Sequence, residues 1–218
     1  MTSAADRRQN ILAGIARAAT LAKRDPSEVQ LVAVSKGHTI EEIEPLIDAG
    51  QRDFAENRVQ EALAKWPALL PEHPDLRLHA IGRLQSNKAA EAVKLFDVIH
   101  SVDRPSLLDA LVREAEKAGR QPELYVQVNI GEEEQKGGCE IGEIGALVDA
   151  VRASPLPLAG LMAIPPVGVE PAPYFALLAK LARRHDVTGL SMGMSSDYPA
   201  AVMLGATAVR VGSALFEG

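Results

Sequence analysis

Lys36 is the residue of this chain best suited to covalent chemistry. It ends the run Leu-Val-Ala-Val-Ser-Lys at positions 31–36, in which four of the five residues before it are apolar. Such a run, followed by Gly37, is typical of a buried strand that ends on a primary amine. An amine in that place can attack a carbonyl carbon. Taken alone, a lysine that caps a strand and extends to water is the more common case.

The segment Val-Arg-Val-Gly-Ser-Ala-Leu-Phe at 209–216 could bind an anion. Because Gly212 has no side chain, an anion can approach its backbone N–H and that of Ser213. A short helix after it would add its positive end. The hydroxyls of Ser-Met-Gly-Met-Ser-Ser-Asp at 191–197 precede a helix start and would complete a phosphate cradle. Taken alone, these segments are more often ordinary turns rich in glycine and serine.

An amine and a phosphate cradle together meet the needs of one kind of cofactor. An aldehyde that carries a phosphate requires an amine for a Schiff base and donors for its anion, and pyridoxal 5'-phosphate (PLP) has both groups. The ring nitrogen of PLP would then face Arg210. Arginine only donates hydrogen bonds, so this nitrogen would stay unprotonated and the ring would be a weak electron sink. We therefore expect no strongly stabilised carbanion.

Hydrophobic periodicity predicts strands that alternate with helices after a leading amphipathic helix within residues 1–24. Strands are expected at 30–35, 52–55, 77–82, 97–101, 124–130, 157–163, 188–193 and 207–211, and helices near 40–49, 56–65, 87–95, 105–118, 140–152, 172–184 and 198–204. This order predicts a single α/β domain over residues 1–218, folded as a (β/α)8 TIM barrel. An open doubly wound sheet is the main alternative, but the chain has no Gly-x-Gly-x-x-Gly fingerprint.

Such a barrel would bring the ends of the predicted strands to one face, where barrel enzymes have their active sites. The residues expected at this face are Lys36, Asn57, His79, Gly82, Asp103, Asn129, Met162, Ser195 and Arg210. The proline-rich stretch at 164–173 is expected to be a loop over the mouth of the barrel.

Composition narrows the range of functions. The chain has 218 residues, of which 47% are hydrophobic, and a net charge of −6. It contains no basic block, so nucleic acid is not an expected partner. No apolar run reaches membrane-spanning length and no signal-like core opens the sequence, so we expect a cytoplasmic protein without a membrane partner. Cys139 is the only cysteine and the histidines share no metal-ligand spacing, so neither a disulfide nor a metal is expected.

Ordered blocks along nearly the whole chain carry a resemblance to a known family. They are Ala-Val-Ser-Lys at 33–36, Phe-Ala-Glu-Asn-Arg-Val-Gln-Glu at 54–61, His-Ala-Ile-Gly-Arg-Leu-Gln-Ser-Asn-Lys at 79–88, Val-Asn-Ile at 128–130, Gly-Leu-Met-Ala-Ile-Pro at 160–165, and the segments at 191–197 and 209–216. With these blocks the sequence resembles the pyridoxal-phosphate homeostasis proteins, which are single-domain relatives of the barrel half of alanine racemase.

The resemblance implies a role for particular residues. Lys36 would carry PLP as a Schiff base, and Arg210 would face the pyridine nitrogen. Ser195, Gly212 and Ser213 would bind the phosphate with Ser191 nearby, and Asn57, His79 and Met162 would line the ring pocket. The sequence departs from the usual family pattern at Ala55, Gly137 and Ser213. Ser213 keeps the hydroxyl of the more common threonine, Ala55 bears on the geometry of Asn57, and Gly137 is expected in a surface loop away from the pocket.

The resemblance favours a PLP carrier in vitamin B6 homeostasis, which buffers and delivers the cofactor without a catalytic cycle. The alternative is a PLP-dependent amino-acid racemase or related enzyme, which needs acid/base groups on both faces of the ring. In alanine racemase, one is a tyrosine from a second domain of the partner subunit. The sequence ends at Gly218, directly after the barrel, so we expect no such domain. Tyr125, Tyr174 and Tyr198 have no evident route to the ring.

A third reading is a phosphate-binding barrel without an aldehyde cofactor, in which Lys36 acts only through its charge. For the carrier, the expected partners are PLP and PLP-requiring apo-enzymes. The oligomeric state is left open between a monomer and a weak homodimer. No role is assigned to Cys139 or Lys136.

Overall fold

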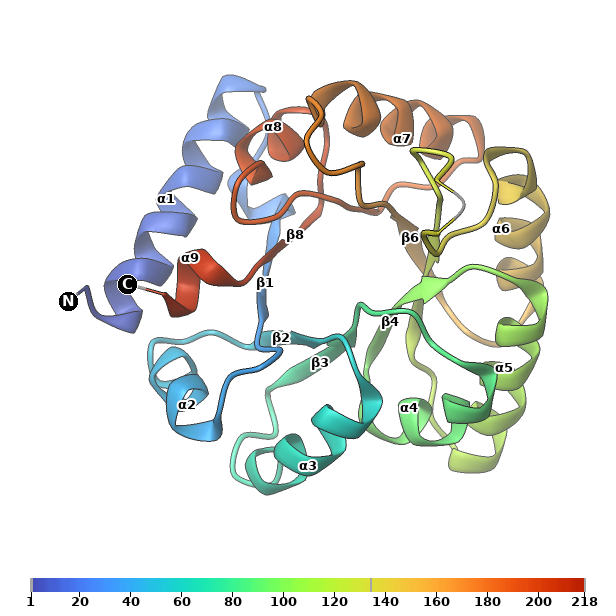
Figure 1. The fold of residues 1–218 in the computed structure, drawn as a ribbon, viewed down its shortest axis with the longest axis horizontal. Helices are drawn as coiled ribbons and strands as arrows, with labels where there is room; N and C mark the ends of the chain where they lie inside the picture. The colour runs from blue at the N-terminus through green and yellow to red at the C-terminus, as the bar shows by residue number, and fades with distance from the viewer. Residues whose placement is uncertain (1, 134, 218) are drawn as a thin grey trace.

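Parallel strands pair in chain order and close on themselves, because β1 pairs with both β2 and β8. The structure is a computed structural model that describes residues 2–133 and 135–217. Helices follow the strands and surround the barrel on the outside (Figure 1). The predicted TIM barrel is thus confirmed, and the open sheet is excluded by the pairing of the first strand with the last.

The bounds of the elements follow the sequence prediction closely. The strands are β1 (Gln30–Val34), β2 (Asp53–Glu56), β3 (Arg77–Ala80), β4 (Val98–Val102), β5 (Glu123–Gln127), β6 (Leu158–Met162), β7 (Leu190–Ser191) and β8 (Ala208–Val211). The α-helices are α1 (Ala4–Leu21), α2 (Ile40–Asp48), α3 (Val59–Leu69), α4 (Ala89–Leu95), α5 (Pro105–Ala118), α6 (Ile144–Ala153), α7 (Ala172–Arg184), α8 (Tyr198–Met203) and α9 (Ser213–Phe216).

Several bounds differ from the prediction by three residues or more, and for α3 and β7 the local structure gives the reason. Helix α3 was expected to begin at residue 56, but Glu56 still pairs with Ala80 in the sheet, so the helix begins at Val59. Strand β7 was expected at 188–193 and contains only two residues. The backbone leaves the strand direction at Gly193, whose φ of +94° is outside the extended region.

Alternation along each strand divides the apolar residues into two layers. In β1, Leu31 and Ala33 belong to the large core between the barrel and the helices, whereas Val32 and Val34 belong to a small cluster inside the barrel. The outer core also contains the largest buried side chains, among them Trp66. The barrel interior is only partly apolar, since buried polar side chains lie there too. They are His79, His100, Gln127, Ser191 and Arg210.

Helix α1 lies on the outside of the barrel beside α8 and α9, which brings the two ends of the chain together (Figure 1). Arg7 Nε donates to the carbonyl of Leu215 at 2.6 Å, and Arg24 Nη1 donates to that of Val202 at 2.7 Å. The leading helix and the turn after it therefore brace α8 and α9. No helix in the described part of the chain is long and apolar enough to cross a membrane.

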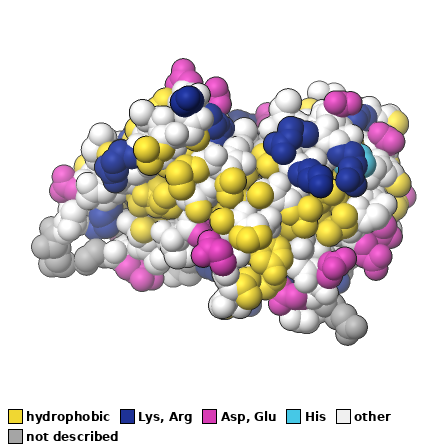
Figure 2. All heavy atoms as spheres, turned by 90° about the horizontal axis from the view of Figure 1, so that it is seen from above, with side chains coloured by type: hydrophobic (Ala, Val, Ile, Leu, Met, Phe, Trp, Pro, Cys, Tyr) yellow, Lys and Arg dark blue, Asp and Glu magenta, His cyan; other side chains and the backbone are white. Residues whose placement is uncertain are grey.

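The side of the molecule that carries α1, α7 and α8 has hydrophobic side chains gathered between basic ones (Figure 2). A groove of about 640 Å³ lies between the loop at 164–171 and α8. Its exposed large hydrophobic residues are Val167, Val169, Met194 and Met203. Ile164, the first residue of this loop, also lines the pocket at the C-terminal ends of the strands, so the loop borders the barrel mouth as predicted.

Candidate functional site

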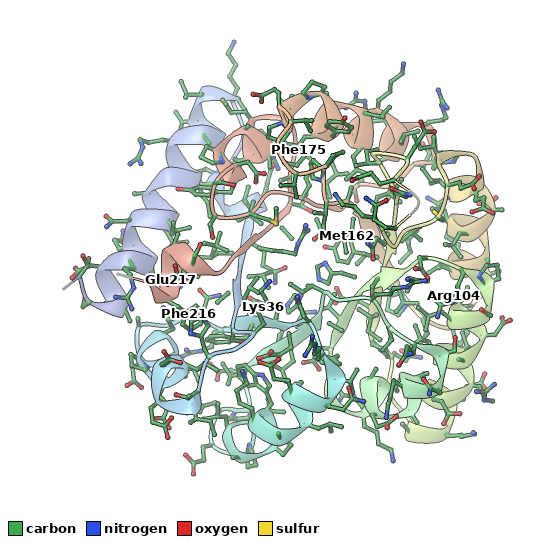
Figure 3. All side chains as sticks on the ribbon, viewed as in Figure 1. Lys36, Arg104, Met162, Phe175, Phe216 and Glu217 are labelled. Carbon is green, nitrogen blue, oxygen red and sulfur yellow. The ribbon has the colours of Figure 1, made fainter. Side chains whose placement is uncertain are left out.

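A pocket of about 600 Å³ opens at the C-terminal ends of the strands. Its lining includes predicted site residues from β1, β2, β7 and β8 and the loops after them, namely Lys36, Asn57, Ser195, Arg210, Gly212 and Ser213. Figure 3 shows Lys36 at the end of β1, close to the centre of the barrel mouth. Segments far apart in the chain thus deliver an amine, hydroxyls and a guanidinium to one cavity.

The other three predicted residues lie deeper than the pocket and do not line it. His79, Met162 and Ser191 are at most 1% exposed. They belong to β3, β6 and β7 themselves, whereas the predicted residues that line the pocket follow their strands, with the exception of Arg210. Met162 lies within the barrel, across from Lys36 (Figure 3).

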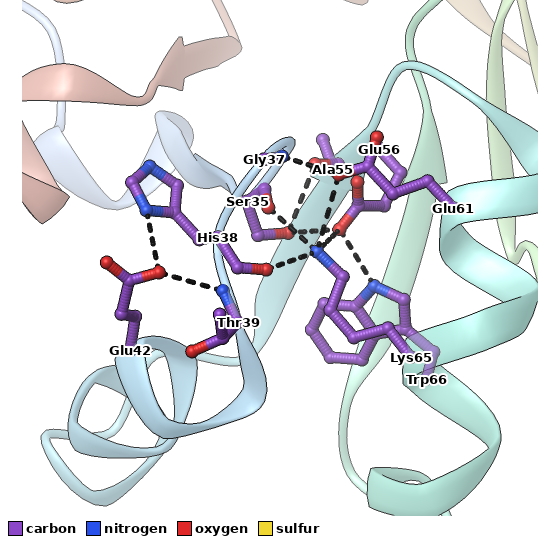
Figure 4. Close-up of polar contacts among 10 residues, drawn as sticks. All are labelled: Ser35, Gly37, His38, Thr39, Glu42, Ala55, Glu56, Glu61, Lys65 and Trp66. Carbon is purple, nitrogen blue, oxygen red and sulfur yellow. Dashed lines mark hydrogen bonds and ion pairs between the residues drawn. The ribbon is translucent and has the colours of Figure 1, made fainter.

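The backbone around Lys36 is fixed by Lys65, a residue of α3 (Figure 4). Lys65 Nζ donates to the carbonyls of Ser35 and His38, each at 2.9 Å. The same ammonium lies 2.8 Å from Glu56 Oε1 in a buried ion pair. These contacts hold the segment on both sides of Lys36, while the side chain of Lys36 makes no hydrogen bond to any described residue.

Two carboxylates complete this support. Glu56 Oε1 also accepts hydrogen bonds from Ser35 Oγ at 2.8 Å and from Trp66 Nε1 at 3.0 Å. Glu61 Oε1 accepts from the backbone N–H of Gly37 at 2.5 Å. Sequence reasoning missed Lys65, Glu56 and Glu61, because the spacing between α3 and residues 35–38 carries no signal of their contact.

A stacked pair connects the Lys36 segment to the C-terminal helix. The rings of His38 and Phe216 are 4.0 Å apart between centroids and are inclined by 12°. His38 lies two residues after Lys36, and Phe216 ends α9, which begins at Ser213. The amine and the expected phosphate donors are therefore on segments that pack against each other.

The loops after β7 and β8 converge as a phosphate cradle requires. The backbone N–H of Gly212 donates to Ser195 Oγ at 3.2 Å. Asp197 Oδ1 accepts from the backbone N–H of Met194 at 2.6 Å, which tightens the turn that presents Ser195. This turn begins at Gly193, where a Cβ would lie 2.6 Å from Ala201 Cβ and the φ of +94° is unfavourable for other residues.

The loops after β2 and β3 meet on the other side of the pocket. A Cβ at Gly82 would lie 2.1 Å from the carbonyl oxygen of Asn57, so only glycine allows this approach. Arg83 and Gln127 also line the pocket here and were missed from the sequence. Gly137 was expected away from the pocket, yet Gln127 Nε2 donates to its carbonyl at 3.2 Å. Gly137 itself is not among the residues that line the pocket, although it contacts Gln127, which is one of them.

Arg210 is a buried cation at the floor of the pocket, with 3% of its surface exposed. Its Nη1 donates to Ser191 Oγ at 2.5 Å, and its Nη2 donates to the carbonyl of Ala163 at 3.1 Å. Burial lowers the pKa of Arg210 to about 10, so the guanidinium remains charged at neutral pH. Within residues 2–133 and 135–217 no carboxylate forms an ion pair with it, and its Nε has no hydrogen-bond partner.

The donors of this pocket fit a phosphorylated pyridoxal. Lys36 supplies a primary amine that has no hydrogen-bond or ion-pair partner among the described residues, as a Schiff base needs. Ser195, Ser213 and the backbone at Gly212 supply neutral donors at one end of the pocket. Arg210 has hydrogen-bond donors and no acceptor, so it suits a pyridine nitrogen that carries no proton. No group of three or more metal-ligating side chains occurs among the described residues.

Comparison with known proteins agrees with this fit. The model of the alanine racemase N-terminal domain matches residues 8–218. A pyridoxal phosphate homeostasis protein from Synechocystis is 42% identical over 201 residues, which cover 88% of this chain and 92% of that protein. One from Pseudomonas aeruginosa is 42% identical over 223 residues, covering 99% and 96%.

Solved structures show the same barrel. PipY of Synechococcus elongatus with PLP bound is 43% identical and superposes with a TM-score of 0.80, covering 93% of this chain and 99% of that one. Alanine racemase from Corynebacterium glutamicum is 19% identical with a TM-score of 0.64, covers 94% of this chain and 60% of that one, and so shares the fold. The barrel, the matched domain and the relatives that span almost the whole chain lead to one conclusion: this chain belongs to the family of pyridoxal phosphate homeostasis proteins.

Proposed function

We propose that this chain binds PLP as a Schiff base on Lys36 and serves in intracellular PLP homeostasis by buffering and delivering the cofactor. The observation that carries the proposal is that Lys36, Ser195, Arg210, Gly212 and Ser213 line one pocket. Relatives that match nearly the whole chain are named for PLP homeostasis, and PipY has been solved with PLP bound.

Each residue has a role that its position supports. Lys36 provides the amine that condenses with the aldehyde, and the contacts of Lys65 keep its backbone in place. Ser195, Gly212 and Ser213 bind the phosphate through hydroxyl and backbone donors. Arg210 donates to the ring nitrogen, and Asn57 lies where it can contact the ring from the loop after β2. PLP supplies the electron-withdrawing ring, which Arg210 leaves unprotonated.

The pocket favours a carrier over a racemase, because a racemase needs a second acid/base group across the ring from the lysine. None of the three tyrosines lines the pocket. Tyr125 is buried in the barrel and stacks on His100 at 4.4 Å between centroids, and Tyr174 and Tyr198 belong to α7 and α8. The names of the relatives also describe homeostasis and not catalysis.

Reduction with borohydride tests the proposal directly. The protein loaded with PLP should be yellow, and after reduction and digestion the cofactor should be attached to the peptide that contains Lys36. Lys36→Ala should abolish this label, whereas Lys88→Ala, at a surface lysine outside the pocket, should keep it. Absence of PLP uptake by the unaltered protein, or a label on another lysine, would overturn the proposal.

Two measurements separate the carrier from the alternatives. Hydrogen–deuterium exchange at the Cα of alanine and other amino acids should be negligible for the loaded protein. Robust exchange that is lost in Lys36→Ala would instead establish a racemase-type enzyme. Transfer of PLP from the loaded protein to a PLP-requiring apo-enzyme should restore that enzyme's activity, and failure to restore it would contradict delivery.

A further inference from the structure

A line of hydrogen-bonded side chains crosses the barrel interior from Asp53, at the start of β2, to Arg210. His79 Nε2 lies 3.0 Å from Asp53 Oδ1, and His79 Nδ1 lies 2.9 Å from His100 Nε2. His100 Nδ1 lies 2.8 Å from Ser191 Oγ, and this hydroxyl accepts from Arg210 Nη1 at 2.5 Å. We call these five residues the barrel chain. Three of them, His79, His100 and Ser191, are at most 1% exposed.

If both imidazole rings are neutral, the two ends of the barrel chain set the direction of every hydrogen bond in it. Arg210 only donates, so Ser191 accepts from it and is free to donate to His100 Nδ1. His100 then carries its proton on Nε2 and donates to His79 Nδ1. His79 likewise carries its proton on Nε2 and donates to the carboxylate of Asp53. With both rings neutral, one proton occupies each contact, and no donor or acceptor in the line is left over.

Burial supports the neutral form of the central ring. The pKa of His100 is well below its usual value, first because the ring is buried and then because His79 and Arg210 lie close to it. Tyr125 stacks on the same ring at 4.4 Å and holds its plane. A neutral imidazole held in a fixed plane has one donor and one acceptor nitrogen. It can therefore accept a hydrogen bond from Ser191 on one side and donate one to His79 on the other.

The position of Arg210 explains why such a line is useful. A buried guanidinium without a carboxylate partner is costly, and Arg210 has no ion pair within the described residues. The barrel chain connects it to Asp53, which also accepts from Gln30 Nε2 at 2.7 Å. The negative charge of nearby Asp197 favours the charged form of Arg210, and the barrel chain adds a second carboxylate, Asp53, at its far end, because each polarised hydrogen bond strengthens the next.

From this geometry we propose that Asp53, His79, His100 and Ser191 are positioning residues for Arg210. They fix Nη1 of Arg210 within the barrel and leave Nε available for the ring nitrogen of PLP. The proposal rests on the proposed function, because it names the supports of the group that meets the cofactor. It assigns His79 and Ser191, both expected in the ring pocket or near the phosphate, to a layer behind the pocket.

The first test does not need the cofactor. Nitrogen-15 NMR of the histidine rings in the ligand-free protein distinguishes a protonated from an unprotonated ring nitrogen. His79 and His100 should both be neutral with the proton on Nε2, assigned through His79→Gln and His100→Gln. A proton on Nδ1 of His100 would make His100 the donor to Ser191. That result would overturn the proposal, whether or not the protein binds PLP.

The second test compares two matched serine substitutions. Ser191→Ala removes the hydroxyl beside Arg210, whereas Ser101→Ala removes a buried hydroxyl of β4 that has no partner among the described residues. Ser191→Ala should weaken PLP binding roughly tenfold and shift the absorption maximum of the bound cofactor, since a hydrogen bond to a charged group is lost. Ser101→Ala should change neither quantity.

A double-mutant comparison shows whether the effect passes through Arg210. Asp53→Asn should weaken PLP binding in the native background and have no further effect in Arg210→Gln, because contacting residues in one network are not additive. Equal effects in both backgrounds would reduce Asp53 to a structural residue and overturn the proposal. If the unaltered protein bound no PLP, the proposed function would fail. The NMR measurement on the ligand-free protein would still test the hydrogen-bond directions in the barrel chain.

Discussion

Lys65 and Glu56 form an ion pair of 2.8 Å behind the backbone of the residue proposed to bind PLP, and both side chains are less than a tenth exposed. The ammonium of Lys65 also binds two carbonyls that flank Lys36, so one buried charge ties α3, β2 and the segment after β1 together. A buried pair of this kind is costly to break, because one partner is left as an uncompensated charge.

Lys65→Met should therefore destabilise the protein and loosen Lys36. Loss of the ammonium leaves Glu56 unpaired, and the free energy of unfolding should fall by about 3–5 kcal/mol. PLP binding should weaken as well, because the Lys36 segment loses two backbone contacts. Urea unfolding and absorbance titration with PLP measure the two effects. The double variant Lys65→Met with Glu56→Gln should recover part of the stability; if it is as unstable as the single variant, the ion pair is not the cause.

Ser195→Ala should reduce affinity for the phosphate group alone. The hydroxyl of Ser195 lines the pocket and accepts a hydrogen bond from the backbone N–H of Gly212. Its removal therefore eliminates one hydrogen-bond donor to the phosphate and one contact between the loops after β7 and β8. Binding of PLP should weaken by about 1.5–3 kcal/mol, the value of a hydrogen bond to a charged group. Pyridoxal, which lacks the phosphate, is the matched control ligand. An equal loss of affinity for pyridoxal and PLP would contradict a phosphate role for Ser195.

Stability should fall in mild acid because of His100. Its folded-state pKa is well below the unfolded value of about 6.5, so the unfolded chain takes up a proton that the native ring does not. The unfolded state therefore binds more protons below this pH, and the contribution of His100 to stability declines from about pH 6.5 downward. Unfolding free energies measured between pH 5 and 8 should show this slope. His100→Phe should flatten it, and an unchanged slope would contradict the prediction.

Cys139 should be unreactive in the folded protein. The thiol is 3% exposed, and burial raises its pKa to about 12, so little thiolate forms at neutral pH. Alkylation with iodoacetamide should be slow in buffer and fast in denaturant, followed by mass spectrometry. Fast labelling of the native protein would show that Cys139 is accessible and would reopen the question of its role.

The sequence by itself determined the barrel and most of its pocket. Strand and helix periods are local properties, so the alternation from β1 to β8 was predictable within a few residues. The strand ends then placed Lys36, Asn57, Ser195, Arg210, Gly212 and Ser213 at one mouth, because all strands of a parallel barrel end at the same face. The boundary of α3 was wrong, since cross-strand pairing extended β2 through Glu56.

The tertiary structure alone decided which residues lie behind the pocket. The contact of Lys65 with the Lys36 segment joins positions 30 residues apart, and that of His100 with Ser191 joins positions 91 apart. Neither has a sequence signal, because such pairs depend on strand register and inward orientation. Depth within the barrel is likewise a three-dimensional quantity. For this reason His79 and Ser191 could be named as part of the site from the sequence, but only the fold places them behind the residues that line the pocket.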